Sequence, residues 1–116
     1  MTIQKDLLAS CWTWAGDVGP GELEQRSPVP LERRIAAVAA AGWEGVGLSH
    51  ADVVEYRDTI GLGSVKRQLD DVGIRRVELE FLTDWWQTDE RRDPADRMRD
   101  DLFEAAAELG TTVVKV

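Results

Sequence analysis

The feature that most constrains the fold of this chain is a unit of helix, glycine and strand that occurs three times. Each copy is the end of an amphipathic helix, then a glycine, then a short run rich in Val, Leu or Ile. The copies read "AAVAAAGWEGVGLSH", "VKRQLDDVGIRRVELEFL" and "LFEAAAELGTTVVKV", and their glycines are Gly42, Gly73 and Gly110. Glycine commonly ends a helix because it adopts the left-handed conformation without strain. Helices that alternate with strands at this spacing predict βαβ units and a parallel sheet.

The pattern predicts four strands and three helical stretches. We expect strands near residues 7–13, 45–49, 74–82 and 111–116, and helices over residues 30–41, up to residue 72, and after Asp93-Pro94. Asp93 is the expected N-cap of the last helix, because a short acidic side chain can accept a hydrogen bond from the free amides of the first turn. The expected buried stripe of that helix follows helical spacing and comprises Met98, Leu102, Phe103, Ala106 and Leu109.

Four strands joined by three crossovers are half of an eight-stranded (β/α)8 barrel, a fold that needs about 250 residues. The chain has 116 residues, enough for one domain. We therefore interpret residues 1–116 as a single α/β domain, the N-terminal half of a TIM barrel that belongs to a longer enzyme. Two alternatives stay open: a complete chain that covers its sheet edges by self-association, and a small doubly wound open sheet.

The third predicted strand carries two carboxylates that favour the barrel. Val77, Leu79 and Phe81 fall on one face and are expected to pack on helices, whereas Glu78 and Glu80 fall on the other face. Inside a barrel, inward residues near the carboxyl ends of the strands face the active site. An open sheet covered on both faces offers no comparable place for two carboxylates. We expect Glu80 to face the barrel mouth and Glu78 to lie deeper, in a structural role.

Composition and charge disfavour several classes of protein. The net charge of −8 and the interleaving of Arg with Asp and Glu argue against a nucleic-acid partner. The one cysteine, Cys11, cannot form an intramolecular disulfide and is interpreted as a buried thiol. The N-terminus lacks the apolar run of a signal peptide, and no segment approaches the roughly 20 apolar residues of a membrane span. The expected location is the cytoplasm, with no membrane partner.

Four short motifs at the ends of the predicted strands resemble those of the xylose-isomerase-like TIM barrels of the sugar isomerase/epimerase superfamily. They are "SCWTW" (10–14), "GVGLSHAD" (45–52), "VELEFLTDWW" (77–86) and "VVKV" (113–116), and together they span nearly the whole chain. The resemblance implies an aromatic-lined sugar pocket and a divalent metal, Mn, Mg, Co or Zn. In that family the metal ligands usually come from later strands. We therefore expect no metal held by this chain alone, and activity only within a full-length enzyme.

The resemblance implies a catalytic role for His50, the one histidine, which directly follows the second predicted strand. In relatives a histidine at this place assists opening of the sugar ring and a carboxylate orients it. Asp52, two residues on, is the candidate for that carboxylate and for a contact to substrate. Neutral imidazole can accept a hydroxyl proton near pH 7. The alternative is a surface histidine beside a helix-capping Asp52.

Glu80 is the second candidate for a catalytic residue, because its carboxylate can hydrogen-bond a substrate hydroxyl or accept its proton. The alternative is a structural ion pair with Lys115 on the next strand. Lys115 could instead contact substrate and neutralise an anionic group. A carboxylate pair without a convergent third ligand is a weak sign of a metal site.

Four tryptophans at predicted strand ends, Trp12, Trp14, Trp85 and Trp86, are candidate substrate-binding residues. Their rings can stack on the C–H faces of a sugar, and the indole N–H can donate to a hydroxyl. They are equally suited to closing the top of a barrel or to an interface. Asp84, which precedes the second pair, either contacts polar groups of the substrate or caps a turn.

The leading hypothesis is a sugar isomerase or epimerase that transfers a proton or a hydride next to a carbonyl of a sugar or polyol. Its metal would be held outside this chain. Dehydratases share the scaffold, so the reaction type is less defined than the substrate class. The main alternative is a non-catalytic half-barrel scaffold that associates with itself, and a homo-oligomer is expected. An apurinic-site endonuclease is disfavoured, because that class needs several histidines and a basic groove.

Overall fold

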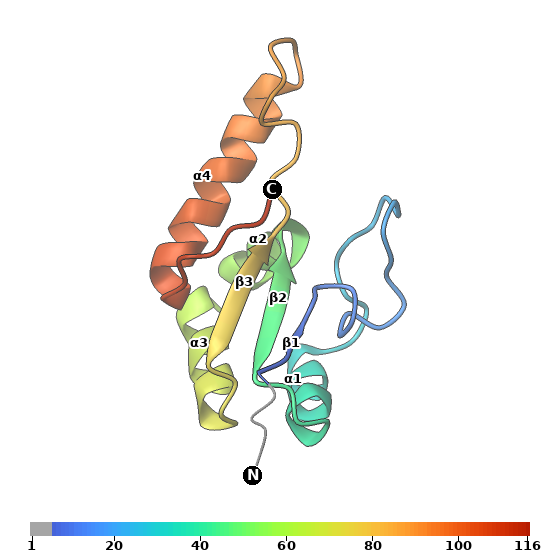
Figure 1. Cartoon of the computed structure of the whole chain (residues 1–116), viewed down its shortest axis with the longest axis vertical. Coiled ribbons are helices and arrows are strands. Elements are labelled where there is room, and N and C mark those ends of the chain that lie inside the picture. The colour runs from blue at the N-terminus through green and yellow to red at the C-terminus, as the bar shows by residue number, and fades with distance from the viewer. Residues whose placement is uncertain (1–5) are drawn as a thin grey trace.

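The structure is a computed structural model of the chain and describes residues 6–116. Its centre is a parallel sheet of three strands in the order β1-β2-β3, where β1 is Leu8–Ala9, β2 is Gly45–Ser49 and β3 is Arg76–Glu80 (Figure 1). Gly45 pairs with Leu8 on one side and with Arg76 on the other, which sets the register. The predicted α/β class with a parallel sheet is therefore confirmed, and the strand predicted over residues 45–49 has those bounds.

Four helices accompany the sheet: α1 is Leu31–Ala40, α2 is His50–Asp58, α3 is Leu62–Asp71 and α4 is Arg92–Leu109. Between β2 and β3 the sequence predicts one helical stretch, whereas the structure has two helices. Gly61 separates them with a φ of +84°, a left-handed conformation that favours glycine.

Helix α2 follows β2 without a connecting loop. Ser49, the last residue of β2, caps the helix, because its Oγ accepts a hydrogen bond from the Asp52 amide at 3.1 Å. His50 is therefore the first helical residue and lies at the carboxyl end of the sheet.

Two predicted strands are much shorter than expected. Strand β1 has two residues, because the chain turns soon after it: the Thr13 amide donates to the Ser10 carbonyl at 2.9 Å. The strand predicted over residues 111–116 is reduced to one parallel bridge between Leu79 and Val114. Backbone hydrogen bonds hold this segment against β3, since the Lys115 amide donates to the Leu79 carbonyl at 2.8 Å. It lies beside β3 as a fourth parallel element without forming a full strand.

Helix α4 starts differently from the prediction. Arg91 is its N-terminal capping residue, so the prediction that Asp93 is the N-cap is wrong. Asp93 lies in the first turn instead, where a carboxylate suits the positive end of the helix dipole.

The predicted buried stripe of α4 is correct except at one position. Leu102 and Leu109 are buried, and Met98 and Ala106 pack against the core. Phe103 is 55% exposed, because it lies about 100° around the helix from Leu102. The small residues Ala95 and Ala105 complete the buried face instead.

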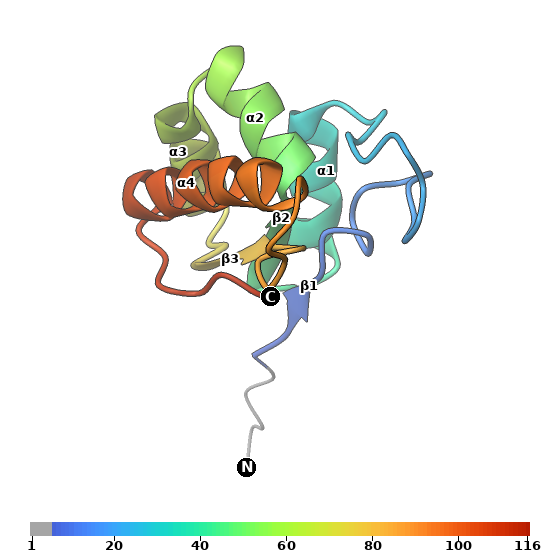
Figure 2. The same cartoon turned by 90° about the horizontal axis from the view of Figure 1, so that it is seen from above.

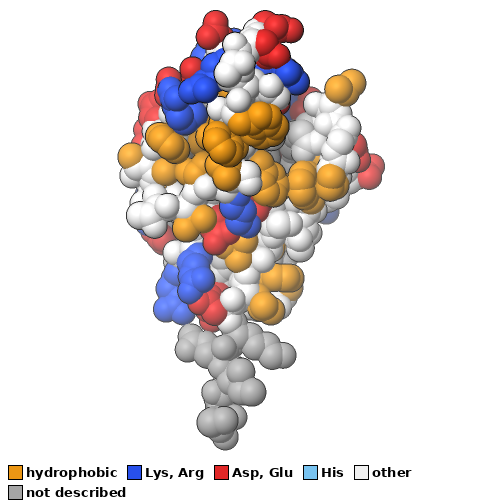
Figure 3. Space-filling model, turned by 45° about the horizontal axis from the view of Figure 1, so that its top comes forward, with side chains coloured by type: hydrophobic (Ala, Val, Ile, Leu, Met, Phe, Trp, Pro, Cys, Tyr) orange, Lys and Arg blue, Asp and Glu red, His pale blue; other side chains and the backbone are white. Residues whose placement is uncertain are grey.

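The helices and the two carboxylates of β3 lie on opposite sides of the sheet. All four helices cover one face, as Figure 2 shows from above. Val46, Leu48 and Leu79 are fully buried within the core on that side. Glu78 and Glu80 alternate with Leu79 and lie on the other face, which the helices in the described residues leave uncovered. Figure 3 shows basic, acidic and hydrophobic side chains side by side on this part of the surface.

Candidate functional site

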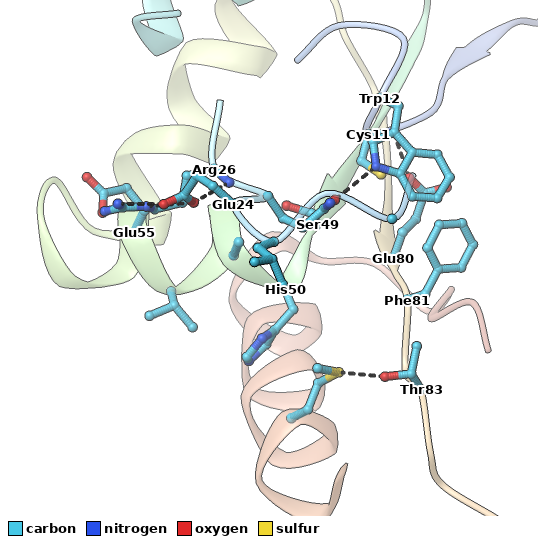
Figure 4. A pocket seen from close by; sticks show the side chains of 16 residues that line it. Cys11, Trp12, Glu24, Arg26, Ser49, His50, Glu55, Glu80, Phe81 and Thr83 are labelled. Atoms are coloured by element: carbon cyan, nitrogen blue, oxygen red, sulfur yellow. Dashed lines mark hydrogen bonds and ion pairs between the residues drawn. The ribbon is translucent and has the colours of Figure 1, made fainter. Parts of the chain in front are cut away.

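A pocket of about 590 Å³ lies at the carboxyl ends of β2 and β3. Its walls come from the turn after β1, the loop of residues 21–26, the start of α2, residues 80–83 and Met98 of α4 (Figure 4). The carboxyl ends of parallel strands are the usual place for ligands in α/β folds. The pocket brings together His50, Glu80 and Trp12 from the predicted set.

Glu80 lines this pocket, but only 1% of the residue is exposed, because protein groups surround its carboxylate. Its Oε2 accepts a hydrogen bond from the Cys11 amide at 2.6 Å, and its Oε1 lies 2.5 Å from Lys115 Nζ. Lys115 Nζ also lies 2.8 Å from Glu78 Oε2. The ion pair between Glu80 and Lys115, which the sequence offered as an alternative, is therefore present.

The ammonium of Lys115 is stabilised by these two carboxylates. Burial disfavours its charge, but hydrogen bonds to Glu78 and Glu80 more than compensate and raise the pKa of Lys115 above its ordinary value. Lys115 contacts Glu80 but does not itself line the pocket, and its contact with substrate stays a prediction.

Gly47 creates the space that Glu80 occupies. A Cβ at this position would overlap the Glu80 carboxylate and would lie 3.0 Å from the Cys11 amide nitrogen. Because Gly47 has no side chain, Glu80 reaches across β2 to the turn that follows β1. The "GVG" of the second strand was a signal for this close approach that the sequence analysis did not use.

Cys11 is a buried thiol, as predicted, with an exposed fraction of 2%. Burial, and then the hydrogen bond and charge of Glu80, raise the pKa of Cys11 to about 12. A thiol with such a pKa remains protonated at neutral pH and is a poor nucleophile. Cys11 therefore contributes its backbone amide and a protonated thiol beside Glu80, not a nucleophile.

His50 pairs with a carboxylate on another helix. Its Nε2 lies 2.8 Å from Oδ2 of Asp101 on α4, and the other oxygen of Asp101 lies 2.8 Å from Arg57 Nη1. Burial opposes ionisation of Asp101, but hydrogen bonds from His50 and Arg57 outweigh it and lower the pKa of Asp101 below its usual range. The expected partner, Asp52, does not orient His50.

Asp52 is instead part of a buried structural network. It is 2% exposed, and its Oδ2 lies 2.9 Å from Nη1 of Arg34. The same Arg34 nitrogen donates to the Tyr56 hydroxyl at 2.7 Å. Burial raises the pKa of Tyr56, so its hydroxyl stays protonated in this network. Asp52 does not line the pocket that contains His50, because it points toward α1.

The first two tryptophans have different roles. Trp12 lines the pocket and stacks on Phe81, with ring centroids 5.2 Å apart and an angle of 27° between the planes. Phe81 was expected to pack on helices, and it lines the pocket because it follows the last residue of β3. Trp14 is buried: its Nε1 donates to the Gly47 carbonyl at 2.7 Å, and the Arg34 guanidinium lies 3.9 Å from its ring centroid. Trp14 is therefore a packing residue.

The second pair of tryptophans lies outside the pocket. Trp85 and Trp86 are 49% and 59% exposed and contact each other edge to face, with centroids 5.8 Å apart. Asp84 precedes them with a φ of +57°, and its carbonyl accepts a hydrogen bond from the Gln87 amide at 3.0 Å. Asp84 thus closes a turn through its backbone, and its contact with substrate stays a prediction.

Sequence analysis missed a charged group on the pocket wall. Arg26 Nη2 lies 2.9 Å from Glu24 Oε2, and Arg26 Nη1 lies 3.4 Å from Glu55 Oε2. Hydrogen bonds from Arg26 lower the pKa of Glu24 to about 2, and Glu24 in turn raises the pKa of Arg26. No periodic signal marks the loop that carries Glu24 and Arg26, so these residues could not be assigned to the pocket from the sequence.

Comparisons with known proteins do not identify a family. No protein-family model matches the chain, and no curated protein is significantly similar to it. None of the helices within residues 6–116 is long and apolar enough to cross a membrane. The resemblance to xylose-isomerase-like barrels stays a prediction.

Proposed function

We propose that the pocket binds an uncharged sugar or polyol, and that the chain is the N-terminal half of a (β/α)8 barrel of the sugar isomerase/epimerase class. The proposal rests on one observation: a histidine that can exchange a proton, a buried carboxylate and two stacked aromatic rings line the same pocket. The pocket is lined by His50, Glu80, Trp12 and Phe81, and Asp101 contacts His50 from α4 outside the pocket. Their place at the carboxyl ends of parallel strands suits a barrel active site.

Each part has a chemical task in such a reaction. The stacked rings of Trp12 and Phe81 offer an apolar surface for the C–H groups of a sugar. Glu80 has one donor on each oxygen, and its fully buried carboxylate supports the pocket wall by holding the turn that carries Trp12. His50 would take a hydroxyl proton, as in ring opening, and return it. The proton or hydride transfer beside the carbonyl follows from the family resemblance alone.

The divalent metal of the family does not fit the side chains described here. Within residues 6–116 no group of three or more His, Cys, Asp or Glu side chains is placed to hold a metal ion. The two inward carboxylates, Glu78 and Glu80, both contact the ammonium of Lys115, which a cation would have to displace. We propose that the metal ligands of such an enzyme lie outside this chain.

The charges of the pocket favour an uncharged ligand over an anionic one. The guanidinium of Arg26 is already paired with Glu24 and Glu55, and the ammonium of Lys115 is paired with Glu78 and Glu80. A phosphate or carboxylate group on the ligand would meet Glu24, Glu55 and Glu80, and within residues 6–116 the arginine and lysine beside the pocket are already paired with carboxylates.

Binding can be tested through the indole N–H signals of the tryptophans in nitrogen-15 spectra. Addition of D-xylose, D-fructose or myo-inositol should shift the Trp12 signal and leave those of Trp85 and Trp86 unchanged. Trp12→Ala should weaken binding about tenfold, as loss of roughly 1.4 kcal/mol of stacking predicts, whereas Trp86→Ala is the matched control. Glucose 6-phosphate should bind more weakly than glucose. Absence of any response at 100 mM sugar, on the order of the weakest useful affinity, would refute the proposal.

A second candidate function is a self-associating scaffold, favoured by the uncovered face of the sheet. Exposed apolar side chains include Leu7, just before β1, and Val113 and Val116 in the segment beside β3, at 49%, 40% and 73%. A second copy could cover them. Light scattering distinguishes the scaffold from the sugar-binding enzyme. A stable dimer that does not bind sugars supports the scaffold, and a monomer that binds a sugar excludes it.

A further inference from the structure

The ring of Trp12 is fixed by two contacts from different parts of the chain. It stacks on Phe81 (Figure 4), and its Nε1 donates a hydrogen bond to Oε1 of Gln25 at 2.9 Å. Stacking sets the plane of the ring, and the hydrogen bond sets its rotation within that plane. An indole nitrogen donates one hydrogen bond and accepts none, so the contact with Gln25 occupies the one polar group of this side chain.

Gln25 belongs to the loop that forms another wall of the pocket. Residues 21–24 and 26 are exposed, whereas Gln25 is half-buried. Its Nε2 donates hydrogen bonds to the Glu22 carbonyl at 2.7 Å and to the Gly19 carbonyl at 3.1 Å. Gln25 therefore closes the loop of residues 19–25 on itself while it contacts Trp12.

The partners of the Gln25 amide define its orientation. The two carbonyls can only accept hydrogen bonds, and the indole N–H can only donate one. The end of the amide that faces Glu22 and Gly19 must therefore be the NH2 group, and the end that faces Trp12 must be the oxygen. A glutamate of the same length would offer no donor to the carbonyls, so this place suits an amide in particular.

We propose that Gln25 is a positioning residue for Trp12: it fixes the ring, joins it to the loop of residues 19–25, and leaves a ligand to contact the carbon atoms of the ring and not its N–H. The same loop brings Gly21 and Leu23 to the pocket, so Gln25 links two of its walls. The contact with a ligand rests on the proposed function, whereas the link between Gln25 and Trp12 does not.

The link can be measured on the indole N–H signal of Trp12 in nitrogen-15 spectra of the whole chain. The five tryptophans give five such signals, and Trp12→Phe identifies the signal of Trp12 by its loss. In Gln25→Ala this signal should shift, and its hydrogen should exchange with water about fivefold faster. That factor corresponds to about 1 kcal/mol, the usual net value of one hydrogen bond.

Gln87→Ala is the matched control. Gln87 is also half-buried in a loop, and its Nε2 lies 3.4 Å from Asp84 Oδ1, outside the pocket. This variant should leave the Trp12 signal and its exchange rate unchanged.

The affinity for D-xylose is a readout that a merely structural role of Gln25 would not change. Gln25→Ala should weaken binding about fivefold, because the ligand must then immobilise the ring itself. In a Trp12→Phe background the ring has no N–H for Gln25 to hold, so the same substitution should cause no further loss. An equal loss in both backgrounds would mean that Gln25 acts without Trp12 and would overturn the proposal.

The spectra give the other decisive outcomes. A Trp12 signal and exchange rate that are unchanged in Gln25→Ala overturn the proposal, and so does an equal change in Gln87→Ala. Should Gln25→Ala not fold, the wild type decides by comparison with Trp86, which is 59% exposed. Slower exchange of the Trp12 N–H than of the Trp86 N–H supports the proposal, and equal rates overturn it.

Failure of the proposed function would be seen separately. If no sugar shifts the Trp12 signal but Gln25→Ala changes that signal and its exchange rate as expected, Gln25 positions Trp12 and the sugar pocket is refuted. If sugars bind equally well to the wild type and to Gln25→Ala, the pocket stands and Gln25 is not a positioning residue.

Discussion

Gly47→Ala places one methyl group where the Glu80 carboxylate now lies. The added Cβ would overlap Glu80 and approach the Cys11 amide nitrogen to 3.0 Å, and neither neighbour is free to move. Glu80 is 1% exposed and held from both oxygens, while the amide belongs to the backbone of a tight turn. Forcing a methyl group into such a packed site costs about 1 to 3 kcal/mol.

Displacement of Glu80 adds a second cost. Its hydrogen bond to the buried Cys11 amide would be lost, and a buried donor without a partner costs about 1 to 3 kcal/mol. We therefore expect Gly47→Ala to lower the free energy of unfolding by about 2 to 6 kcal/mol, a large share of the 5 to 15 kcal/mol typical of a small domain.

Urea unfolding followed by tryptophan fluorescence measures this change, provided that the slope of the transition is unchanged. Gly63→Ala is the matched control, because Gly63 is exposed in α3 and an added Cβ finds no atom closer than 3.5 Å, at Arg67 Nη1. That control should stabilise the protein by about 0.5 kcal/mol, since alanine favours a helix over glycine. A Gly47→Ala variant within 0.5 kcal/mol of the wild type, about the size of a neutral change, would show that Glu80 does not occupy this space.

Three further changes test other parts of the structure. Arg34→Met should lower stability by about 3 to 5 kcal/mol because it leaves the buried Asp52 carboxylate without its positively charged partner, whereas Arg33→Met on the exposed side of α1 should have little effect in the same urea assay. The folded state depresses the pKa of Asp101, so its contribution is present above the unfolded value of about 3.9 and is lost as pH falls through the folded pKa. The stability difference between wild type and Asp101→Asn should therefore shrink below about pH 4, and a difference that persists in acid contradicts the pairing. Native Cys11, with a pKa of about 12, should resist a thiol reagent at pH 8 and react once urea unfolds the chain; rapid labelling without urea would refute its burial.

The sequence predicted best those features that repeat along the chain. The strand Gly45–Ser49 and the parallel order of the sheet follow from the helix–glycine–strand unit, because that unit leaves few other connections. The ion pair of Glu80 with Lys115 could also be predicted, because residues that face the same way at the same position on adjacent parallel strands lie side by side.

Features that depend on turns or on distant pairing were not predictable in this way. Trp12 and Trp14 share a strand parity, but β1 ends at Ala9 and the turn sends one ring into the pocket and the other into the core. The pairing of His50 with Asp101 joins residues 51 positions apart on two packed helices. The spacing of His50 and Arg57 predicts that both side chains lie on one face of a helix, but it does not identify Asp101 as their partner.

The link between Glu80 and Cys11 has a consequence for how the site tolerates substitution. The donor is a backbone amide, so every amino acid except proline supplies it at position 11, within the limit set by the small buried space. The acceptor and the gap that admits it are side-chain properties of Glu80 and Gly47. Alanine scanning should therefore lower stability at positions 47 and 80 but not reveal the role of position 11. We expect position 11 to accept Ser or Ala freely, while positions 47 and 80 can change only as a pair.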